Sequence, residues 1–435
     1  MQVLDLVYSS FKYVTLLVIF ISLFSCGAGG DSSSTDDGVE LNPDFSDLQP
    51  YLPNGPYAAQ LKNCVSIVNI PDSCSLNQLP PIGLDNSTPT IDDILNHLVV
   101  SHMWMGDRMR DLLEMMPADI LLLLRSSTAI VIDADIRPAY FWQLTGAIYI
   151  DPALLWTTNE EKETIDPTED FRSNFGDELQ FKRLWRYIIN NDFAWTSYSL
   201  TGIEERTNAD NLVLTTWLFY HELAHANDCL PSSELDNLAR GDSYYENFLT
   251  IRNSGKCIQD RLTALYPLNS GIWHSLANVL YKGDDATNQQ KTYSAEFVAA
   301  EFITDVASDT YSYSSLWEDT AMLFEEILMK KNFNADRDLV FVDFYDTFTC
   351  SEVLVKWGQR GRLGDSDVIE RARFIVGELL PEIDFTELFA NQPAPFNIPL
   401  DVSYCITDYS SQNAGKHQQS TKAMQVRLQN QHKID

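Results

Sequence analysis

His221, Glu222 and His225 have the spacing of an HExxH motif. On a helix, two histidines four residues apart lie about 40° apart on one face, so both imidazoles can bind the same metal ion, and imidazole suits zinc. Glu222 follows the first histidine, where its carboxylate can take a proton from water at the open position of the metal. The motif therefore predicts a catalytic zinc site.

The residues around the motif predict that it lies on a buried helix. The stretch 212–218 (LVLTTWL) is apolar, and Pro231 ends the helix soon after Asp228. The two histidines would then lie in the last turns of a core helix, where a cleft can open. A catalytic zinc normally has three protein ligands and a water molecule, so a third ligand is expected downstream.

Two downstream stretches offer a carboxylate for the third position. The first carries Glu296 and Glu301 and has the pattern of an amphipathic helix start. In the second, Ser315 and Glu318 have capping-box spacing, which predicts a helix that begins after Ser315 and holds Glu318 in its first turn. Both stretches are candidates on their residues alone.

The sequence HExxHxxD, followed downstream by a tyrosine and then by Glu-Asp-x-Ala-x-x-Phe, resembles the glutamate-ligand zincin metallopeptidases. It is similar in particular to the lethal-factor-type peptidase domain. The resemblance implies that His221, His225 and Glu318 bind zinc, that Glu222 is the general base and that Tyr311 donates a hydrogen bond to the oxyanion. The expected substrate is a peptide or protein.

The same resemblance implies two supporting features. Asp228 would accept a hydrogen bond from a ligand imidazole and fix its tautomer. The stretch 146–151 (GAIYID) is similar to the strand that pairs with extended substrate in such enzymes.

The chain departs from the family in the distance between its motifs. Glu318 follows His225 by 93 residues (318 − 225), which requires an inserted segment. Glu296 lies closer to the motif but has Gln289, and no tyrosine, seven residues before it. Glu318 is therefore favoured as the third ligand, with Glu296 and then Glu301 as the alternatives.

The implied reaction is hydrolysis of a peptide bond by zinc-activated water, with Glu222 passing the proton to the leaving amine. Two alternatives remain open. A cell-surface binding lipoprotein could keep the zinc as a structural brace, or the same residues could hydrolyse cell-wall peptides.

The first 26 residues have the features of an export signal. Lys12 precedes an apolar run, 14–24, that is too short to span a bilayer comfortably. The following Leu23-Phe24-Ser25-Cys26 resembles the lipobox of bacterial lipoproteins, which implies lipidation of Cys26 and a membrane anchor, with Gly27 matching delivery to the outer membrane. Residues 27–57 are rich in Gly, Ser, Asp and Pro and are expected to form a flexible tether.

The six remaining cysteines are even in number and belong to an exported chain, so disulfides are expected, with free buried thiols as the alternative. None forms a CxxC pair, which argues against a cysteine zinc site. Nearest-neighbour pairing would join the following residues: Cys64 with Cys74, Cys229 with Cys257, and Cys350 with Cys405.

The folded part is expected to be one zincin-like catalytic unit, 58–409, which could be bilobal, followed by a polar tail, 410–435. Short apolar runs predict strands at 129–132 and 147–150. Thr90 is expected to open a helix that continues to Met103. Further helices are expected at 174–190, 211–228, 292–307, 315–331 and 367–380. The predicted class is α+β, mostly helical, with a small sheet.

The remaining signals are weaker. His97 and His102 are five residues apart and would point about 140° apart on a helix, so they are interpreted as structural residues. The 62 acidic against 30 basic residues give a net charge of −32, which would repel phosphate backbones and makes nucleic acid an unsuitable partner.

Overall fold

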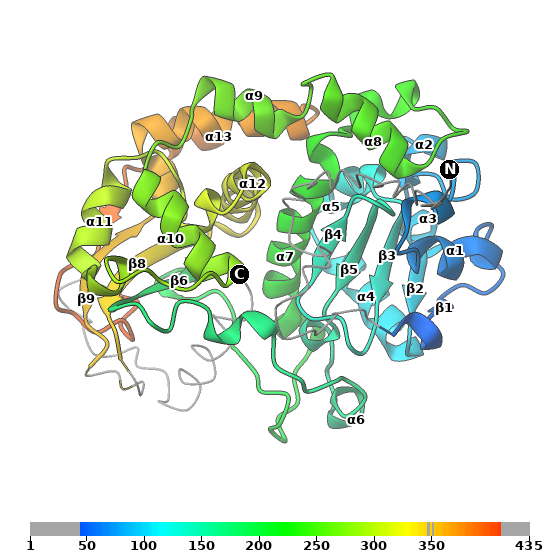
Figure 1. Cartoon of the computed structure of the whole chain (residues 1–435). Helices are drawn as coiled ribbons and strands as arrows, with labels where there is room; N and C mark the ends of the chain where they lie inside the picture. Colours follow the sequence, from blue (N-terminus) through cyan, green and yellow to red (C-terminus); the bar gives the residue numbers. More distant parts are fainter. Residues whose placement is uncertain (1–43, 346–348, 350–351, 410–435) are drawn as a thin grey trace, which may run out of the picture.

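The computed structural model describes residues 44–345, 349 and 352–409. Its β structure forms two five-stranded sheets, with the long helices α7 (Asn208–Asp228) and α12 (Leu316–Phe333) between them (Figure 1). The class is α+β as predicted, but the β structure is larger than the single small sheet that was expected.

The first sheet has the strand order β1-β2-β3-β5-β4. Its strands are β1 (Gln49–Pro50), β2 (Leu98–Val100), β3 (Ala129–Ile132), β4 (Tyr140–Trp142) and β5 (Ala147–Ile150). The inner strands β2, β3 and β5 are parallel, whereas β1 and β4 run antiparallel at the two edges. The prediction of strands at 129–132 and 147–150 is confirmed; both runs are fully buried.

The prediction of one continuous helix from Thr90 to Met103 is wrong, because a strand interrupts it. Thr90 forms the predicted capping box, but α3 (Ile91–Leu95) ends after five residues. The apolar residues that follow form β2 and pair in register with β3. All three side chains, two of them β-branched valines, are buried in the sheet, and a separate helix, α4 (Met103–Met115), begins afterwards.

The second sheet is antiparallel, with the order β10-β9-β8-β6-β7. Its strands are β6 (Phe181–Ile189), β7 (Asp192–Phe193), β8 (Asp336–Asp343), β9 (Val355–Arg360) and β10 (Phe396–Asn397). The predicted helix at 174–190 is therefore wrong. Both faces of β6 are covered, with Trp185 in the main core and Leu184 in a smaller one, and Arg186 is buried in an ion pair with Asp338, so the strand lacks a polar–apolar alternation.

Two central helices connect the sheets. α7 packs on β4 and β5, α12 packs on β8, and the two helices pack against each other (Figure 1). α7 begins at a capping box formed by Thr207 and Asp210 and ends shortly before Pro231. α12 begins after Ser315, whose side chain accepts the backbone N–H of Glu318, as the capping-box spacing predicts.

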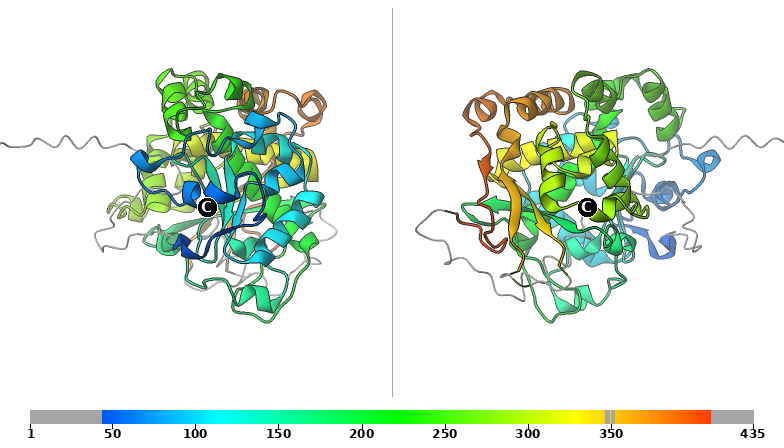
Figure 2. Two further views of the ribbon diagram at one scale, coloured as in Figure 1. Left: turned by 90° about the vertical axis from the view of Figure 1, so that its right-hand side faces the viewer. Right: turned by 60° about the vertical axis from the view of Figure 1, so that its left-hand side comes forward.

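The remaining helices surround this centre. α9 and α13 pack on α12 at one end of the molecule (Figures 1 and 2). Four helices, α8 to α11, fill the segment between the two motifs. The bounds of the other helices are α1 (Ala58–Val65), α2 (Ile82–Asp85), α5 (Asp119–Leu123), α6 (Asn159–Lys162), α8 (Tyr244–Asn253), α9 (Ile258–Leu265), α10 (Gly271–Lys282), α11 (Ala295–Ile303), α13 (Ser366–Leu379) and α14 (Thr386–Asn391).

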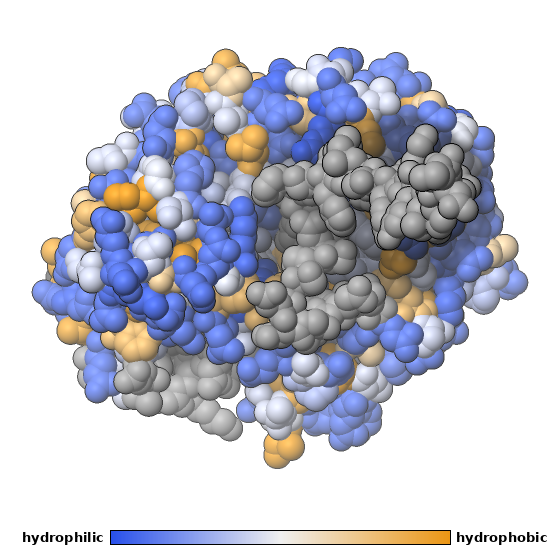
Figure 3. All heavy atoms as spheres, viewed as in Figure 1, coloured by the Kyte–Doolittle hydropathy of each residue, from blue (hydrophilic) through white to orange (hydrophobic). Residues whose placement is uncertain are grey.

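The start of the folded part lies earlier than residue 58. Leu48 and Tyr51 are buried, and β1 pairs with β2, so the end of the expected tether belongs to the first sheet. Residues 1–43, including Cys26, and the tail 410–435 lie outside the described residues. Within the described residues, no helix has the length and apolar character needed to cross a membrane. Hydrophilic side chains predominate on the face shown in Figure 3.

Two of the predicted disulfides are confirmed. Cys64 bonds to Cys74, and Cys229 bonds to Cys257, which joins the end of α7 to the start of α9. The third expected pair involves Cys350, which lies outside the described residues.

Candidate metal centre

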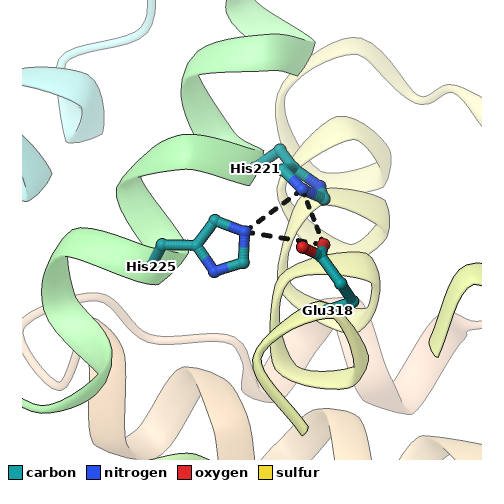
Figure 4. A group of neighbouring side chains, drawn as sticks. All are labelled: His221, His225 and Glu318. Atoms are coloured by element: carbon teal, nitrogen blue, oxygen red, sulfur yellow. Dashed lines mark hydrogen bonds and ion pairs between the residues drawn. The ribbon is translucent and has the colours of Figure 1, made fainter. Parts of the chain in front are cut away.

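Three side chains meet between the central helices. Figure 4 shows His221 and His225 from α7 and Glu318 from α12 pointing toward one another. The Nε2 atom of His221 lies 3.0 Å from Oε2 of Glu318 and 3.3 Å from Nε2 of His225. The distance from His225 Nε2 to Glu318 Oε2 is 3.5 Å. All three residues are buried, and together they could hold a metal ion.

Glu318 is held by the start of its helix. Its backbone N–H donates to Ser315 Oγ at 3.1 Å, which fixes the residue in the first turn of α12. Although Oε2 is close to both histidines, neither carboxylate oxygen receives a hydrogen bond with proper geometry. Two buried oxygen atoms without donors are costly unless a cation binds them.

The electrostatics of the cluster favour a positive charge. Burial alone would lower the pKa of His221, but contacts with Glu318 and Glu325 raise it well above its ordinary value. Burial would raise the pKa of Glu318, but the two histidines outweigh it and the net pKa is lowered. A proton on the His221 imidazole thus supplies the positive charge that a metal cation would supply at this site.

Glu222 lies at the same site on α7. Its side chain is buried, and Oε2 has no hydrogen-bond partner among the described residues. Burial raises the pKa of Glu222 above its ordinary value, partly opposed by His221, His225 and a backbone hydrogen bond from Phe141 of β4. The carboxylate is therefore suited to accept a proton from a water molecule at the site.

Glu325 is a site residue that the sequence analysis missed. It lies seven residues, or about two turns, after Glu318 on the same face of α12. Its Oε2 lies 3.1 Å from Nδ1 of His221, so the other nitrogen of this imidazole faces Glu318. The sequence places this glutamate two helical turns from a candidate ligand, but its burial, which distinguishes it from a surface residue, is known only from the structure.

Tyr311 lies near the cluster and packs against the ring of His221. It begins the short 3-10 helix η8 (Tyr311–Tyr313). Its ring is nearly parallel to that of His221, with 6.2 Å between the ring centroids, and it packs on Tyr281 at 4.7 Å. The side chain therefore lies on the His221 side of the site.

The competing carboxylates do not join this group. Glu296 is exposed on α11, and Glu301 on the same helix is partly exposed. Neither belongs to a described cluster of metal-ligating residues. Of the three candidates, the structure therefore brings only Glu318 to the histidines.

The expected role of Asp228 is wrong. Its carboxylate accepts the backbone N–H of Gln259 at 2.7 Å, which ties α7 to α9, and the residue that contacts a candidate ligand imidazole is Glu325. Asp228 also lies near Cys229 and Cys257 in an arrangement that resembles a second metal site. Those sulfur atoms form a disulfide, however, and are not available as thiolate ligands.

The strand expected to pair with substrate is also misassigned. This stretch contains β5, which pairs with β3 on one side and with β4 on the other. It therefore has no free edge for a substrate strand. The edge of the described sheet that faces α7 belongs instead to β4.

His97 is a structural histidine. It is buried, its Nδ1 lies 2.6 Å from the carbonyl oxygen of Thr128, and its ring packs on Tyr57. His102 precedes α4 and its Nδ1 contacts Ser101 Oγ at 3.1 Å. The two histidines do not share a metal site among the described residues.

Comparison of the chain with models of known protein families, with curated proteins and with solved structures gave no significant match.

Proposed function

We propose that the protein is a zinc-dependent peptidase. The observation that carries the proposal is the meeting of His221, His225 and Glu318 from two separate helices, with Glu222 beside them. Each of these residues has the chemical type and position that the HExxH motif and its resemblance to the glutamate-ligand zincins imply.

The spacing of the three candidate ligand atoms supports zinc. Their separations are 3.0, 3.3 and 3.5 Å. In a tetrahedral site with bonds of about 2.0–2.1 Å, ligand atoms lie about 3.3–3.4 Å apart. The side chains would thus need only small adjustments to bind one zinc ion.

The number of ligands favours a catalytic over a structural zinc. Structural sites are normally closed by four protein ligands, whereas catalytic sites have three and keep one position open. The cluster contains three, and the buried carboxylate next to it is Glu222, which has an oxygen without a partner in the described part of the chain. A bound zinc ion would supply the Lewis acid that polarises a carbonyl group and activates water.

The protein residues would move the proton. Glu222 would accept it from the attacking water and deliver it to the leaving amine. Glu325 would keep His221 oriented by accepting a hydrogen bond from Nδ1. Tyr311 would donate to the developing oxyanion from the His221 side of the site.

Substrate binding is assigned to β4. This strand lies at the edge of the described sheet and packs on α7. An extended peptide adds to an exposed edge through main-chain hydrogen bonds. Phe141 of β4 contacts Glu222, so a peptide paired with this edge would pass the proposed general base.

Metal analysis of single variants tests the ligand set. Purified wild-type protein is expected to hold about one zinc ion per chain, and Glu318→Ala should lose most of it because two imidazoles alone bind weakly. Glu296→Ala is the matched control on an exposed position and should keep the zinc. Zinc lost from Glu296→Ala and kept in Glu318→Ala would overturn the assignment.

We also propose that the protein is exported and that a lipid on Cys26 anchors it to the bacterial outer membrane. Support comes from the apolar run and the lipobox-like residues before Cys26. Labelling with a palmitate analogue should depend on Cys26, and a Cys26→Ala protein that still carries label would contradict the anchor.

A further inference from the structure

One arginine bridges two buried carboxylates behind the metal centre. Arg337 of β8 donates through Nη1 to Glu325 Oε1 at 2.7 Å. It also donates to Asp309 Oδ2 through Nε at 3.1 Å and Nη2 at 2.8 Å. All three side chains are almost completely buried.

Each carboxylate uses its other oxygen on a different part of the site. Glu325 Oε2 contacts Nδ1 of His221 at 3.1 Å. Asp309 Oδ1 accepts the backbone N–H of Tyr311 at 2.9 Å. Arg337 therefore connects a candidate zinc ligand on α7 to the segment that carries the candidate oxyanion donor.

The guanidinium group is itself fixed in orientation. Its central carbon lies 4.3 Å from the ring centroid of Trp185 and 5.4 Å from that of Tyr187. The hydroxyl of Tyr187 also donates to Glu325 Oε1 at 3.2 Å. Because the planar fork of arginine holds its donors at set angles, the two carboxylates are held at a set separation.

We propose that Arg337 is a positioning residue that aligns His221 and the Tyr311 segment with each other. The proposal rests on the proposed peptidase function. Hydrolysis needs the ligand and the oxyanion donor at a fixed spacing, and a displacement of about 1 Å can cost on the order of 100-fold in rate. Arg337 provides that spacing from one strand, without contacting substrate or metal.

A neighbouring ion pair provides a matched control. Arg186 of β6 is equally buried and donates to Asp338 at 2.8 Å, to the backbone carbonyls of Tyr404 and Ile406, and to the hydroxyl of Tyr409. It belongs to the same sheet but has no described contact with Glu325 or Asp309. Replacing Arg186 therefore measures the general effect of disturbing a buried arginine in this sheet, without disturbing Glu325 or Asp309.

The test compares Arg337→Lys with Arg186→Lys in the full-length protein. Lysine keeps the charge but lacks the planar fork of donors that holds the two carboxylates at a set separation. We expect Arg337→Lys to weaken zinc binding, measured by competition with a chelator, and to lower kcat, each by roughly 10- to 100-fold, as for other partners of metal ligands. KM should change little. Arg186→Lys should lower thermal stability while leaving zinc affinity and kcat within about twofold of wild type.

A double variant tests the link to Tyr311. If Arg337 aligns this tyrosine, the kcat losses of Arg337→Lys and Tyr311→Phe should be less than multiplicative when combined. Asp309→Asn, which does not contact the ligands, should also lower kcat and serves if Arg337→Lys does not fold. Multiplicative losses, or equal zinc affinities in wild type, Arg337→Lys and Asp309→Asn, would overturn the positioning role. If wild type binds zinc but hydrolyses nothing, the function proposal fails, while the zinc affinities still test Arg337.

Discussion

The Oε2 atom of Glu325 lies 3.1 Å from Nδ1 of His221, whereas Glu326, the next residue of α12, accepts the backbone N–H of Leu363 at 3.3 Å. Both glutamates are buried. They differ in whether they contact the metal centre, so they form a natural pair for testing the role of Glu325.

Glu325→Gln is expected to weaken zinc binding by roughly 10- to 100-fold, because the imidazole loses its anionic acceptor. Chelator competition with the purified protein measures this affinity. Burial raises the pKa of Glu326 to about 8, so this side chain is largely protonated at pH 7 and Glu326→Gln replaces it with a neutral group of the same shape. Zinc affinity should be unchanged in Glu326→Gln, and equal losses in both variants would contradict the specific role of Glu325.

The two described disulfides are expected to contribute unequally to stability. Cys229–Cys257 closes a 28-residue separation and Cys64–Cys74 one of 10. Because each disulfide lowers the entropy of the unfolded chain, it is expected to stabilise the fold by roughly 3.5 kcal/mol for Cys229–Cys257 and roughly 2.5 kcal/mol for Cys64–Cys74. Thermal unfolding of the two double-alanine variants should show the larger loss of Tm for the first pair. A reversed order would mean that strain or residual unfolded structure outweighs loop length.

His97 is expected to make stability depend on pH. Burial lowers its pKa to about 4 from an ordinary value of 6.5, although the hydrogen bond to Thr128 partly opposes this. Between these pH values the unfolded chain binds a proton that the folded chain does not. The contribution of His97 to the free energy of unfolding is therefore fully present above pH 6.5 and is lost as the pH is lowered toward 4. The loss amounts to about 3 kcal/mol.

Urea unfolding of metal-free protein at pH 7.5 and pH 4 measures this effect. Removing the metal first prevents zinc release from contributing to the difference. His97→Gln cannot titrate, so its unfolding free energy should fall by about 3 kcal/mol less than that of wild type over this range. Parallel losses in the two proteins would show that other groups dominate.

The sequence was informative where a local signal coincided with the final structure. The Ser315 and Glu318 spacing predicts the start of α12, and the fold has this helix start. His221 and His225 are four residues apart, so they share one face of any helix that contains both. α7 is helical throughout this region. The fully apolar runs of β3 and β5 predict strands because both faces of these strands are buried.

The sequence was misleading where tertiary contacts decide. Arg186 and Arg337 are polar residues in buried strands, and their partners Asp338, Asp309 and Glu325 cannot be deduced from spacing along the chain. These buried ion pairs remove the alternation that marks a strand, so β6 was assigned to a helix and β8 was not expected. The same buried ion pairs position the metal centre through Glu325. Because they join residues far apart in the sequence, spacing alone does not predict this role.

The most direct test of a zinc peptidase compares Glu222→Gln with wild type in hydrolysis of a peptide library, both loaded with one zinc ion per chain. Glu222→Gln should keep the zinc and the fold, because its carboxylate is not among the proposed ligands, and should lose hydrolysis by roughly 100-fold or more, since the proton acceptor is gone while the Lewis acid remains. Wild-type activity in zinc-loaded Glu222→Gln would contradict the account.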